Sequence, residues 1–145
     1  TIESWDCSNI EFSGIGFGSA DYCASTGGDM GKASLAYGRG KIINAAALYN
    51  TLALDGVWLD FRDPEGCKEE TLYVKTMGFK GRFAIHPDQI KPIHDAYRPT
   101  TEELEWAKGV LEEAKTAGSG AFKYQGKMVD APVLAVARLI ISRED

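Results

Sequence analysis

The chain has 145 residues, a formal net charge of −5 at pH 7 and 44% hydrophobic residues, which fits one domain of ordinary size. The negative charge provides no basic footprint for a nucleic acid, and no apolar run approaches the ~20 residues of a membrane span. We therefore expect no nucleic-acid or membrane partner. Three scattered cysteines without a CxxC spacing favour a reducing compartment, the cytoplasm, over a disulfide framework or a structural zinc site.

The first predicted element is a buried strand over residues 12–17, which leads through small residues to Asp21. Gly16 and Gly18 carry no Cβ and let a ligand approach the backbone. The N–H groups of residues 19–21 can line an anion site, and Asp21 is a hard oxygen ligand suited to a divalent cation that also holds an oxyacid. A glycine-rich strand end that an aspartate merely terminates is the simpler interpretation of the same residues.

The next stretch predicts a loop, a helix and a second strand. Residues 23–31 are rich in Gly, Ser and Thr and predict a loop. Residues 32–54 predict a helix because their apolar side chains fall largely on one face. Residues 57–61 predict a strand that again ends in acidic residues.

A third helix and a third strand complete this alternation. Asp63 and Pro64 predict an N-cap and first turn, and Gly78 predicts the end of that helix. Residues 82–85 predict a strand that ends at His86, with a short helix to about residue 97. Short apolar strands alternating with helices predict a parallel sheet covered by helices, an α/β fold.

In such folds the chemistry lies at the carboxyl ends of the strands. The polar residues expected there are Asp21, Asp60, Arg62, Asp63 and His86. Two of these have simple structural explanations. Capping fully explains Asp63, and a hydrogen bond within its loop explains His86.

After residue 98 the pattern changes to a helix, a hairpin and a helix. Thr100 and Glu103 form a capping box, and an amphipathic helix follows. Residues 121–129 predict a hairpin around the turn at residues 125–126. Asp130 then precedes a last helix over residues 133–142. We expect residues 1–98 to form the α/β part and residues 99–145 an appended unit.

Five motifs in this order carry a family resemblance; they lie at residues 16–22, 55–63, 77–79, 84–89 and 126–132. From about residue 15 to its end, the chain resembles the C-terminal half of the citrate lyase β-subunit-like family of CoA-ester lyases. That family includes citramalyl-CoA and malyl-CoA lyases and belongs to the HpcH/HpaI aldolase superfamily. Each motif alone is weak, but five in sequence are specific.

The resemblance implies the C-terminal part of a TIM (β/α)8 barrel plus a helix–hairpin–helix lid extension, and assembly as a homotrimer or hexamer. Residues 1–98 would hold the last βα units, and residues 99–145 the lid and oligomerisation extension. A whole barrel needs about 250 residues, and three strands alone leave open sheet edges. We therefore expect a fragment, or a chain whose other half is separate.

The resemblance also implies a Mg²⁺ site, with Mn²⁺ as a substitute ion. Asp21 resembles one metal ligand, and Glu3, in an apolar-Glu-Ser motif, resembles the other. Glu3 lies closer to Asp21 than the family pattern has it, by roughly two helical turns of ~3.6 residues each. Gly18, Ser19 and Ala20 would bind the substrate carboxylate. The family's catalytic arginine belongs upstream and has no counterpart in this sequence.

Asp130 matches the acid that the family's lid extends into the active site of a neighbouring subunit. The alternative is an N-cap of the last helix, which Asp130-Ala131-Pro132 suits well, and one carboxylate does not easily fill both roles at once. Arg39 and Lys41 are basic residues near the region where coenzyme A would bind, and we expect them to be solvated.

The function implied by the resemblance is a Mg²⁺-dependent CoA-ester lyase, located in the cytoplasm or in the mitochondrial matrix of a eukaryote. It would cleave a 3-hydroxyacyl-CoA thioester of the malyl-CoA or citramalyl-CoA type into an acyl-CoA and a 2-oxo acid. One alternative is a CoA-free class II 2-oxo-acid aldolase, against which the lid motif argues. The other is a non-catalytic α/β fragment or assembly subunit, which the upstream sequence would decide.

Overall fold

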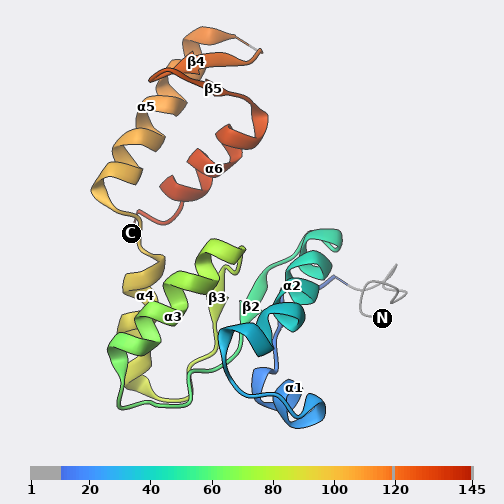
Figure 1. The fold of residues 1–145 in the computed structure, drawn as a ribbon. Coiled ribbons are helices and arrows are strands. Elements are labelled where there is room, and N and C mark those ends of the chain that lie inside the picture. Colours follow the sequence, from blue (N-terminus) through green and yellow to red (C-terminus); the bar gives the residue numbers. More distant parts are fainter. Residues whose placement is uncertain (1–10, 119, 145) are drawn as a thin grey trace. The chain divides into compact units, whose positions relative to one another are not determined.

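The computed structural model describes residues 11–118 and 120–144, which form two compact units divided after Tyr97 (Figure 1). Glu3, an expected metal ligand, lies outside the described residues. The elements of the first unit are β1 (Ile15–Gly16), α1 (Ser19–Thr26), α2 (Lys32–Leu48), β2 (Ala53–Asp55), α3 (Pro64–Met77), β3 (Gly81–Arg82), the 3-10 turn η2 (Pro87–Gln89) and α4 (Ile90–Tyr97).

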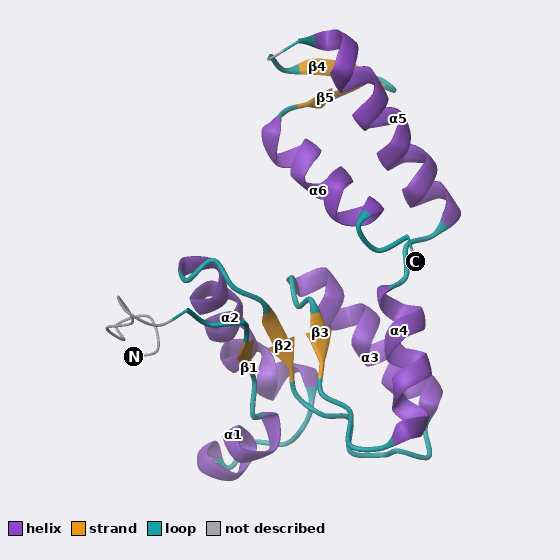
Figure 2. Cartoon of the chain, turned by 180° about the vertical axis from the view of Figure 1, so that it is seen from behind, coloured by secondary structure: helices purple, strands orange, loops and turns teal. Residues whose placement is uncertain are grey.

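The three short strands of the first unit form a parallel sheet in the order β1-β2-β3, as Figure 2 shows. The core lies between this sheet and α2 and α3. Its buried residues are Ile15, Ala45, Ala46, Ala53, Val74 and Phe79. Helix α4 packs along α3, where the Lys75 ammonium donates to the Ala96 carbonyl at 3.1 Å. The predicted parallel sheet with covering helices is confirmed.

Two boundaries near the start of the chain differ from prediction. Residues 23–31 are not all loop, because α1 begins at Ser19 and ends at Thr26 with Gly27 in the left-handed conformation (φ 73°). The sequence does not predict this helix, because only Ser19 and Cys23 are buried on it and no apolar stripe marks it. Strand β1 is also shorter than the predicted residues 12–17, since the chain leaves the sheet after Phe17 donates to the Leu54 carbonyl at 2.9 Å.

The second strand lies earlier than predicted. Helix α2 ends at Leu48, and Asn50 adopts a left-handed backbone conformation (φ 49°) that breaks the helix. Strand β2 then uses residues that continue the apolar pattern of the helix, which is why residues 32–54 predicted one helix. The predicted strand at residues 57–61 is a turn region outside the sheet, with Leu59 54% exposed. Strand β3 is likewise shorter than the predicted residues 82–85.

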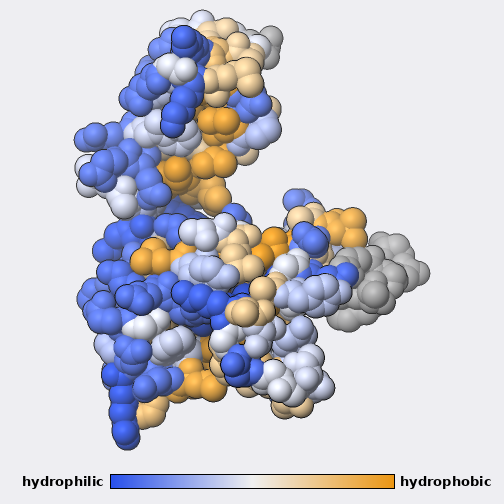
Figure 3. Space-filling model, viewed as in Figure 1, coloured by the Kyte–Doolittle hydropathy of each residue, from blue (hydrophilic) through white to orange (hydrophobic). Residues whose placement is uncertain are grey.

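The second unit contains α5 (Thr101–Ala117), β4 (Phe122–Tyr124), β5 (Lys127–Val129) and α6 (Ala131–Ile141). The predicted capping box is confirmed, since Glu103 N–H donates to Thr100 Oγ1 and Thr100 N–H to Glu103 Oε2. The predicted hairpin turn is also confirmed, with positive φ at Gln125 and Gly126. The buried core of the second unit consists of Ala107, Val110, Val129 and Ala137. On its surface, apolar residues gather over α6 (Figure 3).

A buried ionic cluster joins the sheet to its helices. Asp55, at the end of β2, is fully buried between Arg39 of α2 and Arg82 of β3. Arg39 donates through Nε and Nη2 to the two carboxylate oxygens of Asp55, each at 3.0 Å. Arg82 Nη2 lies 3.3 Å from Asp55 Oδ2. This bidentate geometry is the strong form of a charged pair.

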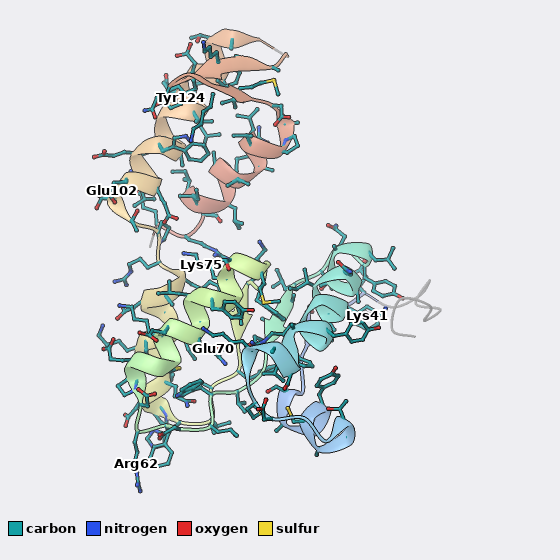
Figure 4. The ribbon with its side chains drawn as sticks, viewed as in Figure 1. Lys41, Arg62, Glu70, Lys75, Glu102 and Tyr124 are labelled. Carbon is teal, nitrogen blue, oxygen red and sulfur yellow. The ribbon has the colours of Figure 1, made fainter. Side chains whose placement is uncertain are left out.

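Both arginines also contact other groups in this layer, although the buried Nη1 of Arg39 has no hydrogen-bond partner among the described residues. Arg39 Nη2 lies 2.8 Å from Glu70 Oε1, and Glu70 points from α3 toward α2 (Figure 4). Arg82 donates to Thr71 Oγ1 and to the carbonyl of Gly56, both at 3.2 Å. Two buried cations and two buried anions therefore balance, which is the condition for burying charge.

Arg39 corrects the expectation of a solvated side chain, because only 2% of it is exposed. Burial by itself lowers the pKa of Arg39, but hydrogen bonds and attraction from Asp55 and Glu70 outweigh burial and raise that pKa above its ordinary value. The buried guanidinium of Arg39 is thus stabilised by two acids from other elements, Asp55 and Glu70.

Replacing Asp55 with alanine should lower the free energy of unfolding by about 3–5 kcal/mol, because two buried guanidinium groups lose their shared partner. Urea unfolding of the natural polypeptide followed by circular dichroism measures this change. The control is Lys91→Ala. The side chain of Lys91 is 83% exposed and its ammonium lies 2.6 Å from Asp95, so its removal should cost no more than about 0.5 kcal/mol. Equal effects of the two variants would contradict a structural role for the cluster.

Candidate active site at the end of the first strand

A cavity of about 300 Å³ lies where β1 ends and α1 begins. Its lining residues are Gly16, Phe17, Gly18, Ser19, Ala20, Asp21, Val57 and Phe83. The structure therefore brings the expected substrate-binding residues together with the expected metal ligand Asp21. It does so at the carboxyl end of a parallel strand, where α/β proteins place their ligands.

The first turn of α1 supplies donors and a carboxylate to this cavity. Gly18 is the N-cap residue, and Asp21 lies in the first turn. The carboxylate folds back over Gly18, since a Cβ built there would lie 3.1 Å from Asp21 Oδ2. The Ser19 N–H donates to the Phe17 carbonyl at 3.0 Å. The Ala20 and Asp21 N–H groups are thus the ones at this helix start that can bind an anion.

Ser19 contributes a buried hydroxyl to the cavity wall. Only 2% of the residue is exposed, and its Oγ has no hydrogen-bond partner among the described residues. A Cβ at Gly56 would lie 2.1 Å from this Oγ, so the absence of a side chain at position 56 makes room for it. The start of α1 therefore packs directly against the loop that follows β2.

Asp21 fits a divalent cation as one ligand of a set. Its side chain is exposed at the cavity, and a carboxylate that leaves room for water and substrate oxygens suits Mg²⁺. The described residues contain no group of three or more His, Cys, Asp or Glu side chains able to hold a metal. Glu3, the other expected ligand, lies outside the described residues, and the metal site stays a prediction.

The other polar residues expected at the strand ends have local structural partners. Asp63 accepts from the Gly66 N–H at 2.9 Å, which confirms it as the N-cap of α3. His86 accepts from the Asp88 N–H at 3.3 Å, and its ring stacks on Phe61 with centroids 4.7 Å apart.

Asp60 and Arg62 belong to the turn that precedes α3. Asp60 Oδ1 accepts from the Arg62 N–H at 3.0 Å. The Arg62 guanidinium lies over the ring of Phe61, with Cζ 5.3 Å from the centroid, and its side chain extends from the loop between β2 and α3 (Figure 4). Sequence reasoning thus placed these two residues at a strand end, whereas they lie in the turn that precedes α3.

Asp130 is the N-cap of α6 in the second unit. Its Oδ1 accepts from the Val133 N–H at 3.3 Å, so the capping interpretation is confirmed. The preceding hairpin exposes Met128, 71% of which is accessible, beside an apolar hollow of about 300 Å³. The acid–base role expected for Asp130 remains a prediction.

Sequence reasoning missed Phe83 and Val57 in the cavity. The sequence predicts both as buried apolar residues of strands, yet Phe83 is 46% exposed. The available signal was the position of Phe83 directly after a charged residue, Arg82, at a strand end. Alternation along a strand puts neighbouring side chains on opposite faces. Arg82 and Phe83 therefore had to face opposite sides of the sheet.

Comparison with known proteins identifies the family. A family model described as C-C_Bond_Lyase of the TIM-Barrel fold matches residues 40–144. The chain belongs to this C–C bond lyase family. Rat mitochondrial citramalyl-CoA lyase is 36% identical to it over 87% of the chain and 39% of the relative. A citrate lyase subunit beta-like protein of Mycobacterium tuberculosis is 39% identical over 90% of the chain and 50% of the relative.

A solved structure extends this similarity. The crystal structure of the M. tuberculosis protein CitE, in complex with magnesium, acetoacetate and coenzyme A, matches with a TM-score of 0.76 and 36% identity over 91% of the chain and 52% of CitE. This C–C bond lyase chain thus spans half or less of the length of the curated relatives named above. No helix among the described residues has both the length and the apolar character to cross a membrane.

Gly56→Ala should lower the free energy of unfolding by about 1–3 kcal/mol, because the new methyl group overlaps Ser19 at the start of α1. Gly40→Ala is the matched control, since nothing lies within 4 Å of a Cβ at that position of α2; it should be neutral or stabilising by up to about 1 kcal/mol. Urea unfolding compares the two. If adding Ser19→Gly to Gly56→Ala recovers none of the lost stability, the contact is not the cause.

Proposed function

We propose that the polypeptide carrying this chain is a Mg²⁺-dependent CoA-ester lyase. It cleaves a C–C bond of a 3-hydroxyacyl-CoA, of the malyl-CoA or citramalyl-CoA type, to give an acyl-CoA and a 2-oxo acid. The observation that carries this proposal is the exposed Asp21 carboxylate beside helix-start N–H groups in one cavity, within a chain of the C–C bond lyase family.

The cavity residues suit the oxo-acid half of such a substrate. The Ala20 and Asp21 N–H groups, at the positive end of the α1 dipole, would hold its carboxylate. Asp21 would be one protein ligand of a bound Mg²⁺, which supplies Lewis-acid stabilisation of negative charge on the oxo-acid oxygens. The expected partner Glu3 is part of this proposal. The magnesium and the acetoacetate bound to CitE support it.

The reaction also needs an acid–base group that protonates the α-carbon of the acyl-CoA. When the C–C bond of the 3-hydroxyacyl-CoA breaks, the hydroxyl loses its proton and the bonding electrons pass to the α-carbon of the acyl-CoA, which must then be protonated. We assign this protonation to Asp130. Its capping contact is the single hydrogen bond from the Val133 N–H to Oδ1, at 3.3 Å, and leaving the cap would cost about 1 kcal/mol.

In this proposal the second unit is a lid that brings Asp130 to the cavity of a neighbouring subunit in a homotrimer or hexamer. Its exposed Met128 and the adjoining apolar hollow offer a surface that a partner would cover. Closure of such a lid excludes water from the reactive carbanion. A location in the cytoplasm, or in mitochondria as for the rat relative, fits these substrates.

Asp21→Asn should lower lyase turnover by roughly 10²-fold or more at low Mg²⁺, because an amide replaces an anionic metal ligand. Mg²⁺ titrations of turnover and of Mn²⁺ binding, the latter followed by electron paramagnetic resonance, test this on the natural polypeptide. Asp29→Asn is the matched control; Asp29 is an exposed carboxylate that accepts from Ser34 Oγ and the Gly31 N–H. Unchanged Mn²⁺ affinity in Asp21→Asn would exclude Asp21 as a ligand.

Asp130→Asn should lower turnover by roughly 10²–10⁴-fold, the usual contribution of a positioned acid–base group, while stability stays nearly unchanged because Asn also caps helices. Asp63→Asn makes the same change at another N-cap that Pro follows and should leave turnover close to wild type. Mixed oligomers of Asp130→Asn and Asp21→Asn subunits should regain activity if the acid acts across a subunit boundary. With mixing verified by native mass spectrometry, absence of rescue would contradict that part of the proposal.

A further inference from the structure

Gln89 is a buried amide at the end of η2, with only 1% of its surface exposed. Its Nε2 donates to the Trp58 carbonyl at 2.7 Å, and its Oε1 accepts from the Ile85 N–H at 2.9 Å. Trp58 belongs to the loop that follows β2, and Ile85 to the segment that follows β3. One side chain therefore joins two segments at the carboxyl edge of the sheet.

The Gln89 amide takes the place of a backbone hydrogen bond between these segments. The pairing of β2 with β3 ends with the Phe83 N–H, which donates to the Asp55 carbonyl at 3.1 Å. Beyond that bond, residues 56–60 and 84–86, all of which the structure describes, share no backbone hydrogen bond. A primary amide carries a donor and an acceptor, as a peptide group does, so Gln89 continues the pairing where the backbone stops.

Val57, in the lining of the cavity that contains Asp21, lies between two anchored carbonyl groups. The Gly56 carbonyl before it accepts from Arg82 Nε at 3.2 Å. The Trp58 carbonyl after it accepts from the Gln89 amide. Loss of the amide would therefore free the backbone on one side of Val57.

Phe83, another residue of the cavity lining, is held in the same way on the neighbouring segment. Its own N–H donates to the Asp55 carbonyl, and two residues later the Ile85 N–H donates to Gln89. Its ring reaches β1, since a Cβ built on Gly16 would lie 2.5 Å from Cε2 of the ring. The direction of this ring depends on the backbone on both sides of it, and Gln89 anchors the outer side.

We propose that Gln89 is a positioning residue of the active site, which fixes Val57 and Phe83, the two apolar walls of the cavity, relative to each other. A bound oxo acid meets these walls in the ground state and in the transition state alike, so their displacement weakens substrate binding. Asp21 lies on α1, and neither hydrogen bond of the Gln89 side chain reaches that helix. This inference rests on the lyase function proposed above and adds to its site a residue outside the cavity lining.

The test uses the natural polypeptide with Gln89→Met, which keeps the length of the side chain and removes both hydrogen bonds. In the condensation of acetyl-CoA with pyruvate or glyoxylate, the KM for the oxo acid should rise roughly 10-fold, the scale of a pocket contact. The kcat should stay close to wild type, as when an interaction common to ground and transition states is lost. Mn²⁺ affinity, measured by electron paramagnetic resonance, should not change, because Asp21 keeps its place. Partial unfolding alone would instead lower the apparent kcat at an unchanged KM.

Lys75→Met is the matched control. The Lys75 ammonium donates to the Ala96 carbonyl at 3.1 Å, so this variant also removes a side-chain hydrogen bond between two elements of the first unit. Lys75 lies in the last turn of α3, at the opposite end of that helix from the loop that carries Arg62 (Figure 4), and its loss should leave the KM unchanged. Hydrogen exchange followed by mass spectrometry should be faster at Ile85 in Gln89→Met and unchanged there in Lys75→Met.

A second variant keeps the test open if Gln89→Met does not fold. Gln89→Asn retains the amide on a side chain one methylene shorter, so it should raise the KM by less than Gln89→Met. If each Gln89 variant that folds keeps the wild-type KM, or if Lys75→Met raises the KM equally, the inference is overturned and the lyase function stands. If the wild-type protein cleaves no 3-hydroxyacyl-CoA and binds neither oxo acid with Mg²⁺, the lyase function fails and the inference with it.

Discussion

The pairing of Asp55 with two arginines is the constraint on which the first unit depends. Its three strands are two or three residues long, so their ladders alone contribute few hydrogen bonds. Asp55 joins β2 to α2 through Arg39 and to β3 through Arg82. Breaking such a buried cluster is costly because each remaining charge stays desolvated. The cluster therefore ties together the layers that a short sheet would hold weakly.

The same cluster positions the candidate active site. Arg82 Nε holds the carbonyl of Gly56, and Gly56 in turn leaves space for Ser19 at the start of α1. The first turn of α1 presents Asp21 to the cavity. A continuous set of contacts thus runs from the buried ions to the proposed metal ligand.

The two faces of the sheet carry different chemistry at adjacent residues. Arg82 faces the helices and takes part in the ionic cluster, whereas Phe83 faces the cavity and rests on Gly16. Alternation along an extended strand produces this separation without any special backbone geometry. One short segment therefore contributes both to the ionic cluster and to the cavity wall.

Local signals in the sequence determined the features whose causes are themselves local. Asp63 with Pro64, the capping box of Thr100 and Glu103, and the turn at Gln125 and Gly126 were all predicted, because a cap or a turn depends on residues within a few positions. The five motifs likewise determined the family, since they occur in order along nearly the whole chain. The parallel sheet followed from the alternation of helices and apolar strands.

Tertiary structure decided which apolar segment entered the sheet and which charges were buried. Residues 53–55 and 57–61 are both apolar enough to pair, and only the register against Ile15 and Gly81 selected the first. Arg39 was expected in solvent because its acid, Asp55, is 16 positions away in sequence. The contact of Phe83 with Gly16 joins residues on two strands separated by a third, and no local pattern encodes which side chain will fill the space above a glycine.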